Sequence, residues 1–117
     1  MSNYFLKKGA MLIVLSLLTF SPFALASGEE VKMQGLIMNI DLKQNTMVVN
    51  EKTFTWLPNT AIHNDKGSPI TMDRFKQYAW VYIEGEKDEN NRIQIKKIYL
   101  LPKRVDKKEK HLYPFME

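Results

Sequence analysis

Side chains able to do acid–base chemistry are few and scattered in this chain of 117 residues. It contains two histidines, His63 and His111, and no cysteine. A hydrolytic site needs a nucleophile beside a base, or two carboxylates that face one cleft. His63 adjoins a predicted turn and His111 falls near the C-terminus, so neither stands in a motif that supplies such a partner. The sequence therefore predicts a protein that is not an enzyme.

The densest run of oxygen ligands lies between the last two predicted strands. Asp88, Glu89, Asn90 and Asn91 follow one another there, and carboxylate and amide oxygens suit calcium. Their spacing matches no calcium-binding loop, so the run fits the solvated tip of a hairpin better. We therefore expect neither a metal ion nor any other cofactor.

Aromatic side chains offer a second candidate chemistry. Phe54, Trp56, Trp80 and Tyr82 stand on two predicted strands, where they could form a stacking surface for bases or sugars. We favour the alternative that two or three of them fill the interior of a small barrel, because such interiors are packed by side chains. The acidic loop at 88–89 disfavours a polyanion. If these four residues bind a ligand, we expect an oligosaccharide or a cationic small molecule and no nucleic acid.

The first 26 residues have the order of a secretory signal peptide. Lys7 and Lys8 precede an apolar run at 10–20, and an A-x-A cleavage sequence ends at Ala26. A spanning helix needs about 20 apolar residues, so this run is too short to be the better candidate. The sequence predicts export to the periplasm or beyond, with membrane contact through the signal peptide alone. The alternative is an uncleaved N-terminal anchor; a lipoprotein is excluded because no cysteine follows.

The composition of the remaining chain limits its partners and its stability. Without residues 1–26, the chain keeps 91 residues with 15 basic and 13 acidic side chains, a net charge of +2. So small a charge is weak evidence for an acidic partner. Because no disulfide can form, a domain of this size must depend on its apolar core.

Alternating side chains and turn residues predict five strands. The central one is 79–86, in which large side chains occupy both faces: Trp80, Tyr82 and Glu84 on one, Val81 and Ile83 on the other. The other predicted strands are 31–40, 46–49, 53–57 with a short extension at 60–63, and 92–101. A strand ends at Pro58 because proline cannot donate to a ladder.

One short helix is predicted between the third and fourth strands. Thr71 is a good N-cap, and Met72 and Phe75 form an apolar pair on one helical face, so the helix spans 72–77. No other segment of the chain after residue 30 shows a helical pattern.

Two changes of parity in the apolar pattern predict β-bulges. In the first strand the change falls between Met33 and Leu36, and Gly35 stands at it. A glycine inside a strand usually marks a bulge or a sharp bend, although it can merely weaken the strand. In the last strand the change places a bulge at Lys96-Lys97.

The predicted elements follow one another as three strands, a helix and two strands, which is the order of the OB-fold barrel. We therefore expect an all-β, five-stranded OB-like barrel at 31–101, preceded by a polar lead at 27–30. The alternative is an open, strongly bent sheet made of the same strands.

The same residues resemble a family of secreted bacterial small β-barrel domains of unknown function. The matching residues are Gly35-Leu36-Ile37, Val48-Val49-Asn50, Asn59-Thr60-Ala61-Ile62, Lys66-Gly67, Phe75-Lys76, Trp80 to Gly85 and Ile98-Tyr99-Leu100. These are core and turn positions, so the resemblance indicates a fold far more than an activity. One departure is Tyr78, which stands where such domains commonly carry glycine.

The C-terminal tail, 102–117, combines a charged linker with an apolar, aromatic tip. Leu112, Tyr113 and Phe115 could dock into a groove of a partner protein or fold back onto the barrel. We expect the first outcome, which makes the protein a non-catalytic exported binding or assembly module whose partner is an envelope protein. The alternative is a periplasmic module that binds a small ligand through its aromatic face. The sequence does not predict an oligomeric state.

Overall fold

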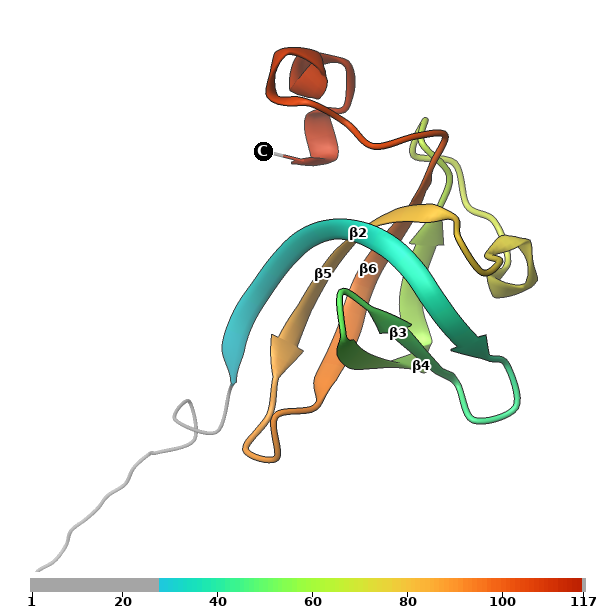
Figure 1. Cartoon of the computed structure of the whole chain (residues 1–117), viewed down its shortest axis with the longest axis vertical. Helices are drawn as coiled ribbons and strands as arrows, with labels where there is room; N and C mark the ends of the chain where they lie inside the picture. The colour runs from blue at the N-terminus through green and yellow to red at the C-terminus, as the bar shows by residue number, and fades with distance from the viewer. Residues whose placement is uncertain (1–27, 117) are drawn as a thin grey trace, which may run out of the picture.

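The computed structural model describes residues 28–116, which form a small β-barrel with a C-terminal extension (Figure 1). Its strands are β2 (Glu29–Asp41), β3 (Thr46–Val49), β4 (Lys52–His63), β5 (Trp80–Lys87) and β6 (Ile93–Leu101). Short 3-10 helices follow as η3 (Met72–Arg74), η4 (Lys107–Leu112) and η5 (Pro114–Met116). The predicted signal peptide, 1–26, lies outside the described residues.

The strands close into a barrel in the order β2-β3-β4-β6-β5, because β2 pairs with both β3 and β5. Neighbouring strands are antiparallel except for β4 and β6, which run parallel. This is the arrangement of an OB-like barrel. The five-stranded all-β barrel predicted from the sequence is confirmed, and the open sheet considered as its alternative is wrong.

The β-bulge of the first strand lies at Met38 and not at Gly35. Ile37 and Asn39 pair with consecutive residues of β3, so Met38 between them has no partner there. Gly35 keeps the regular register with β5. The predicted position was wrong because the bulge turns an apolar side chain outward, which an inside-outside pattern cannot anticipate.

Gly35 is required for a different reason, the close approach of the β3–β4 turn. A Cβ atom at this position would lie 2.6 Å from Val49 Cγ1 and 3.0 Å from each side-chain amide atom of Asn50. Ordinary carbon contacts are about 3.5 to 4.0 Å. The missing side chain therefore lets the curved β2 pass against the turn (Figure 1).

Strand β4 is longer than predicted because it continues past Pro58. Four of its residues, 57–60, stand opposite a single residue of β6. The Thr60 hydroxyl holds this irregular segment, since it donates to the Ile95 carbonyl at 2.7 Å and accepts from the Leu57 amide at 2.9 Å. A bulge can accommodate proline because its missing N–H is not needed in the ladder.

The predicted helix at 72–77 is a single 3-10 turn, η3. Met72 and Phe75 do form an apolar pair, and both are buried in the barrel core. The backbone has already left the helical conformation at Phe75, where φ is −90° and ψ is 128°. Tertiary packing of these two side chains outweighs the weak tendency of so short a segment to continue as a helix.

The central strand β5 divides its side chains as predicted, with Val81 and Ile83 fully buried inside the barrel. Strand β6 has one residue more than β5 over their paired length, because Glu84 pairs with Lys97 and Gly85 with Ile95. The extra residue is Lys96, which confirms the predicted bulge at Lys96-Lys97.

The barrel interior is apolar and contains residues from every strand. Its fully or nearly fully buried members are Ile37, Met47, Val49, Phe54, Trp56, Met72, Phe75, Val81, Ile83, Ile93, Ile95 and Ile98. A second apolar cluster lies on the outer face of β5 and β6, where the C-terminal tail covers it.

Candidate functional site

The four aromatic residues predicted as a ligand-binding surface do not lie together. Phe54 and Trp56 are in the barrel core, 0% and 7% exposed, whereas Trp80 and Tyr82 lie on the outer face of β5. Rings enclosed in the core offer no face to a ligand. The prediction of a shared stacking surface is therefore wrong for Phe54 and Trp56, and the interior-filling alternative describes these two residues.

The tail folds back onto the barrel and occupies the aromatic face that remains. Phe115 stacks on Tyr99 with ring centroids 3.8 Å apart and an interplanar angle of 2°, and it contacts Tyr82 at 5.9 Å. On the other side of Tyr99, the His63 ring stacks at 4.9 Å. The tail is thus held by a continuous series of rings that begins on β4 and ends in η5.

Two hydrogen bonds between Gln34 and Val105 fix the start of this tail. The Gln34 side chain donates to the Val105 carbonyl at 2.8 Å and accepts from the Val105 amide at 2.7 Å. Val105 and Met116 are themselves buried against the barrel. The predicted free docking peptide is therefore wrong for Phe115, which packs on its own barrel. Tyr113 is half-buried, and Leu112 remains exposed.

Burial beneath the tail changes the acidity of the tyrosines there. It raises the pKa of Tyr82 from 10.0 to about 12, and the neighbouring Glu84 carboxylate contributes to this rise. The pKa of Tyr99 is raised by the same causes. The folded protein thus favours the neutral phenols more strongly than the unfolded chain does.

We expect the protein to lose stability as the pH rises from about 10 to about 12. Tyr82 of the unfolded chain ionises near pH 10.0, whereas folding holds the pKa of Tyr82 at about 12. The stabilisation is therefore complete below about pH 10 and declines above it. Melting temperatures across this range should fall less steeply in Tyr82→Phe, with a remaining decline from Tyr99. Equal slopes in both proteins would contradict the assignment.

Asp88 and His63, which were considered for metal or acid–base chemistry, make contacts that stabilise the fold. Oδ1 of Asp88 accepts hydrogen bonds from the Asn90 and Arg92 amides, both at 2.9 Å, and so shapes the β5–β6 hairpin. His63 stacks on Tyr99, and its buried Nδ1 has no hydrogen-bond partner within the described residues. Within residues 28–116, no group of three or more His, Asp or Glu side chains could hold a metal ion. The absence of catalysis stays a prediction.

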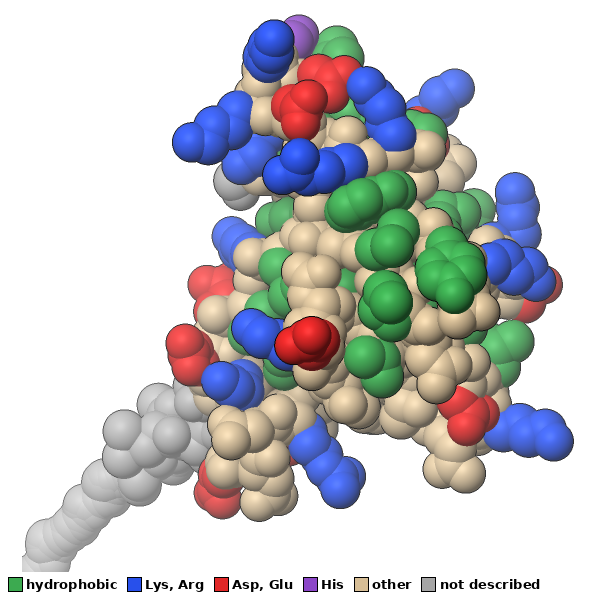
Figure 2. Space-filling view, viewed as in Figure 1, with side chains coloured by type: hydrophobic (Ala, Val, Ile, Leu, Met, Phe, Trp, Pro, Cys, Tyr) green, Lys and Arg blue, Asp and Glu red, His purple; other side chains and the backbone are tan. Residues whose placement is uncertain are grey.

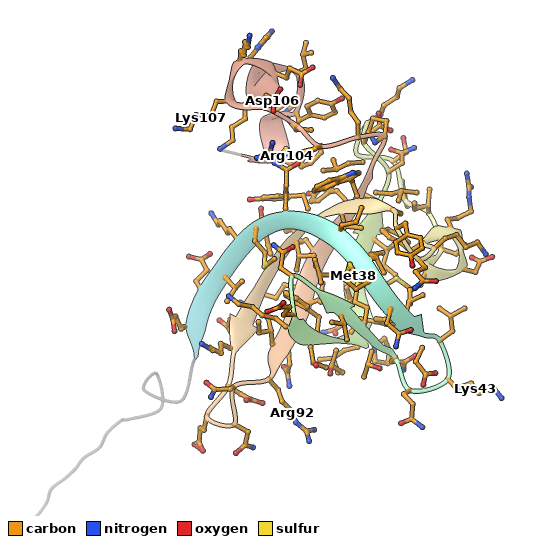
Figure 3. The ribbon with its side chains drawn as sticks, viewed as in Figure 1. Met38, Lys43, Arg92, Arg104, Asp106 and Lys107 are labelled. Carbon is orange, nitrogen blue, oxygen red and sulfur yellow. The ribbon has the colours of Figure 1, made fainter. Side chains whose placement is uncertain are left out.

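A strip of exposed apolar side chains crosses the outside of β2 and the start of β5. We call it the Met38–Tyr78 strip and define it by Leu36, Met38, Tyr78 and Trp80. Met38 is 46% exposed and Tyr78 is 63% exposed. The cross-strand pair Leu36 and Trp80 is half-buried, and Trp80 packs against the cluster that the tail covers. Figure 2 shows hydrophobic side chains gathered on this face, and Figure 3 labels Met38 within it.

Hydrogen bonds hold the turn of Tyr78 against the bulge of β2. The Tyr78 amide donates to the Ile37 carbonyl at 2.7 Å, and the Ile37 amide donates to the Ala79 carbonyl at 2.9 Å. The Gln77 side chain donates to the Met38 carbonyl at 2.9 Å. The two most exposed apolar residues of the strip are therefore held side by side by backbone geometry.

Tyr78 adopts a left-handed conformation that bulky residues rarely take. Its φ is +72°, a region that costs a side-chain-bearing residue about 1 to 2 kcal/mol relative to the right-handed one. Glycine would take this conformation freely. The chain thus carries an exposed aromatic residue where both the backbone and the solvent favour its replacement.

The sequence contained signals for part of this strip. Tyr78 stood out as a departure from glycine, but nothing in its neighbourhood showed that its ring is exposed. Met38 fits the apolar pattern of β2, and only the bulge turns it to solvent. As for membrane contact, none of the helices within residues 28–116 is long and apolar enough to cross a bilayer.

Comparisons with known proteins find similar barrels among solved structures but no matching family. No family model matches the chain, and no curated protein matches it. The barrel is similar to Ag(I)-bound CusF of Escherichia coli, residues 10–88, with 17% identity, 64% of this chain and 95% of that chain covered, and a TM-score of 0.48. Apo-CusF, residues 6–88, gives 14% identity, 69% and 98% coverage, and a TM-score of 0.48.

A fimbrial biogenesis protein, PilY2 of Pseudomonas aeruginosa, is similar to the same extent. Its identity to this chain is 18%, with 62% of this chain and 87% of that chain covered and a TM-score of 0.47. At this level of identity the similarity concerns the barrel alone, so the binding properties of this chain are argued from its own residues.

Proposed function

We propose that this protein is a non-catalytic, exported module that binds an envelope protein through the Met38–Tyr78 strip. The observation that carries the proposal is Tyr78, an exposed aromatic residue in a strained left-handed conformation. Strained backbone persists where the surrounding structure enforces it, and it concentrates at binding and catalytic sites. Exposed apolar patches also mark contact surfaces.

The proposal moves the partner-binding surface from the tail to the barrel. The tail tip packs Phe115 against Tyr82 and Tyr99 and buries Met116 in the same cluster. The strip has no such cover from residues 28–116, since Met38 and Tyr78 remain the exposed members. A partner would gain free energy by removing these two side chains from water.

Charges around the strip define the chemistry of the partner. Arg74 and Lys76 precede Tyr78 in and after the η3 turn, and Arg104 lies above the arch of β2 (Figure 3). One acid, Asp73, accompanies them, and Asp106 lies 3.8 Å from Arg104. These three bases and two acids leave an excess of one positive charge, which favours a partner segment that presents an apolar or aromatic anchor with an adjacent carboxylate.

Site-specific photo-cross-linking tests the proposal. A photoreactive phenylalanine analogue is placed at position 78 in one sample and at position 112 in another, because Tyr78 and Leu112 are 63% and 61% exposed. We expect position 78 to cross-link, in intact cells, to an envelope protein with an acidic contact segment. Position 112 should not give this product, because the partner covers the strip and not the tail.

The same experiment can contradict the proposal in two ways. Cross-linking at position 112 without cross-linking at 78 would return the function to the tail. An absence of products at both positions, with the protein folded and exported, would remove protein binding through either surface.

A further inference from the structure

A polar groove of about 610 Å³ lies away from the strip, between the outer face of the β3–β4 hairpin and the β5–β6 hairpin. The β3–β4 side supplies Thr46, Glu51, Lys52, Thr53 and Thr55. The β5–β6 side supplies Lys87, Asn90, Asn91, Arg92 and Ile93. Its polar groups are hydroxyls, amides and cations, with a single carboxylate.

The register of the hairpin explains why three threonines meet in this groove. Thr46 pairs across the strands with Thr55, whereas the next residues, Met47 and Phe54, pair with each other inside the barrel. Thr53 follows on the same outer face as Thr55 because side chains alternate along a strand. The alternation that fills the core therefore places the hydroxyls outside.

The opposite wall is held in shape by its own turn. The Asp88 carboxylate accepts hydrogen bonds from two backbone amides of the β5–β6 hairpin. Asn91 adopts a left-handed conformation with φ +63°. Asparagine tolerates this region better than most residues. The turn thereby presents Asn90, Asn91 and Arg92 toward the groove from a fixed backbone.

Three cations that line the groove form no ion pair with an acid of residues 28–116. They are Lys52, Lys87 and Arg92. Figure 3 labels Arg92 below the β3–β4 hairpin. Glu51 is the one acid of the lining, which therefore carries an excess of two positive charges. The two acids of the β5–β6 hairpin, Asp88 and Glu89, do not line the groove, and Asp88 Oδ1 accepts hydrogen bonds from the Asn90 and Arg92 amides.

We infer that this groove binds an acidic oligosaccharide, with sugar carboxylates at Lys52, Lys87 and Arg92. Arginine and lysine bind carboxylates by charge-assisted hydrogen bonds, and the threonine and asparagine side chains can exchange hydrogen bonds with sugar hydroxyls. Single-stranded nucleic acid is disfavoured because no aromatic ring of the described residues lines the groove for base stacking. The inference uses residues outside the strip, so it can fail without affecting the proposed function.

Titration of the protein, expressed from its full-length reading frame, with oligogalacturonate tests this inference. Backbone amide signals of Thr53, Thr55 and Asn91 should shift, and the affinity should fall as salt screens the charges. Replacing Lys52 and Arg92 together by glutamine should weaken binding at least about tenfold, as expected for the loss of hydrogen bonds to charged groups. Lys43→Gln, a loss of positive charge on the exposed β2–β3 turn (Figure 3), should leave the affinity within about twofold.

Several results would overturn the inference. Binding of neutral dextran oligosaccharides with equal affinity would show that the cations are not used. If Lys43→Gln lowered the affinity as much as the double variant does, the effect would come from net charge and not from this groove. Tighter binding of oligothymidylate would replace the acidic glycan by a nucleic acid, and no binding of oligogalacturonate would remove the site.

Discussion

Deleting residues 105–117 should lower the free energy of unfolding by about 4 kcal/mol. The deletion removes the burial of Val105 and Met116, each worth roughly 1.5 to 3 kcal/mol. It also removes the Phe115–Tyr99 stack, which adds about 1 kcal/mol beyond the area it buries. The conformational entropy regained by the tail offsets part of this sum. Chemical denaturation of the two proteins measures the difference.

The matched control for this deletion is Leu112→Ala. Leu112 lies in η4 of the same tail but is 61% exposed, so its truncation should change stability by less than about 0.5 kcal/mol. A deletion variant with unchanged stability would show that the tail does not pack on the barrel in solution. The tail would then be free to act as the docking peptide that its sequence suggests.

The second large effect is expected from Gly35→Val. The new Cβ would lie 2.6 Å from Val49 Cγ1, in a position where β2 and the β3–β4 turn cannot separate without breaking their pairing. Overpacking of this kind costs up to about 3 kcal/mol. Thermal melting should show a correspondingly large decrease, and the variant should also unfold at a lower denaturant concentration.

Gly67→Ala separates this steric effect from backbone strain. Gly67 has φ +84°, and a Cβ atom at this position would meet no atom of the described residues within 4 Å, so alanine there introduces strain without a collision. Its cost should be about 1 kcal/mol. If Gly35→Val were no more destabilising than Gly67→Ala, the close approach at Gly35 would be disproved.

Much of the barrel could be predicted because its strands alternate and its turns are polar. The boundaries of β3, the bulge at Lys96 and the burial of Met72 and Phe75 all follow from local patterns. The bulge at Met38 could not be predicted, because an outward-facing methionine looks like one more core residue. The continuation of β4 past Pro58 depends on Thr60, whose hydrogen bond reaches a residue 35 positions away.

The candidate site was harder to predict. Alternation of side chains along a strand divides them between two faces, but it does not show which face the rest of the chain covers. In β5, Trp80 and Tyr82 are larger than Val81 and Ile83, yet the smaller pair fills the barrel. Tyr82 is buried as well, but by the tail, which comes from a distant part of the chain. Tyr78 was visible as a departure from glycine, whereas its positive φ and the hydrogen bond that holds its turn to the Met38 bulge required the structure.

The most direct test of the proposed binding surface is Tyr78→Gly, measured for both stability and partner affinity. Glycine relieves the left-handed strain, so we expect a free energy of unfolding that is unchanged or higher by up to about 1 kcal/mol. The control is Glu51→Gly, which relieves a similar strain at φ +65° in the β3–β4 turn, outside the strip.

With the partner identified by cross-linking at position 78, we expect Tyr78→Gly to weaken binding at least about tenfold, as for loss of an aromatic anchor, while Glu51→Gly binds like the original protein. Such a variant would be as stable as the original protein and yet deficient in binding. Undiminished affinity in Tyr78→Gly would contradict the claim that this strip is the binding surface.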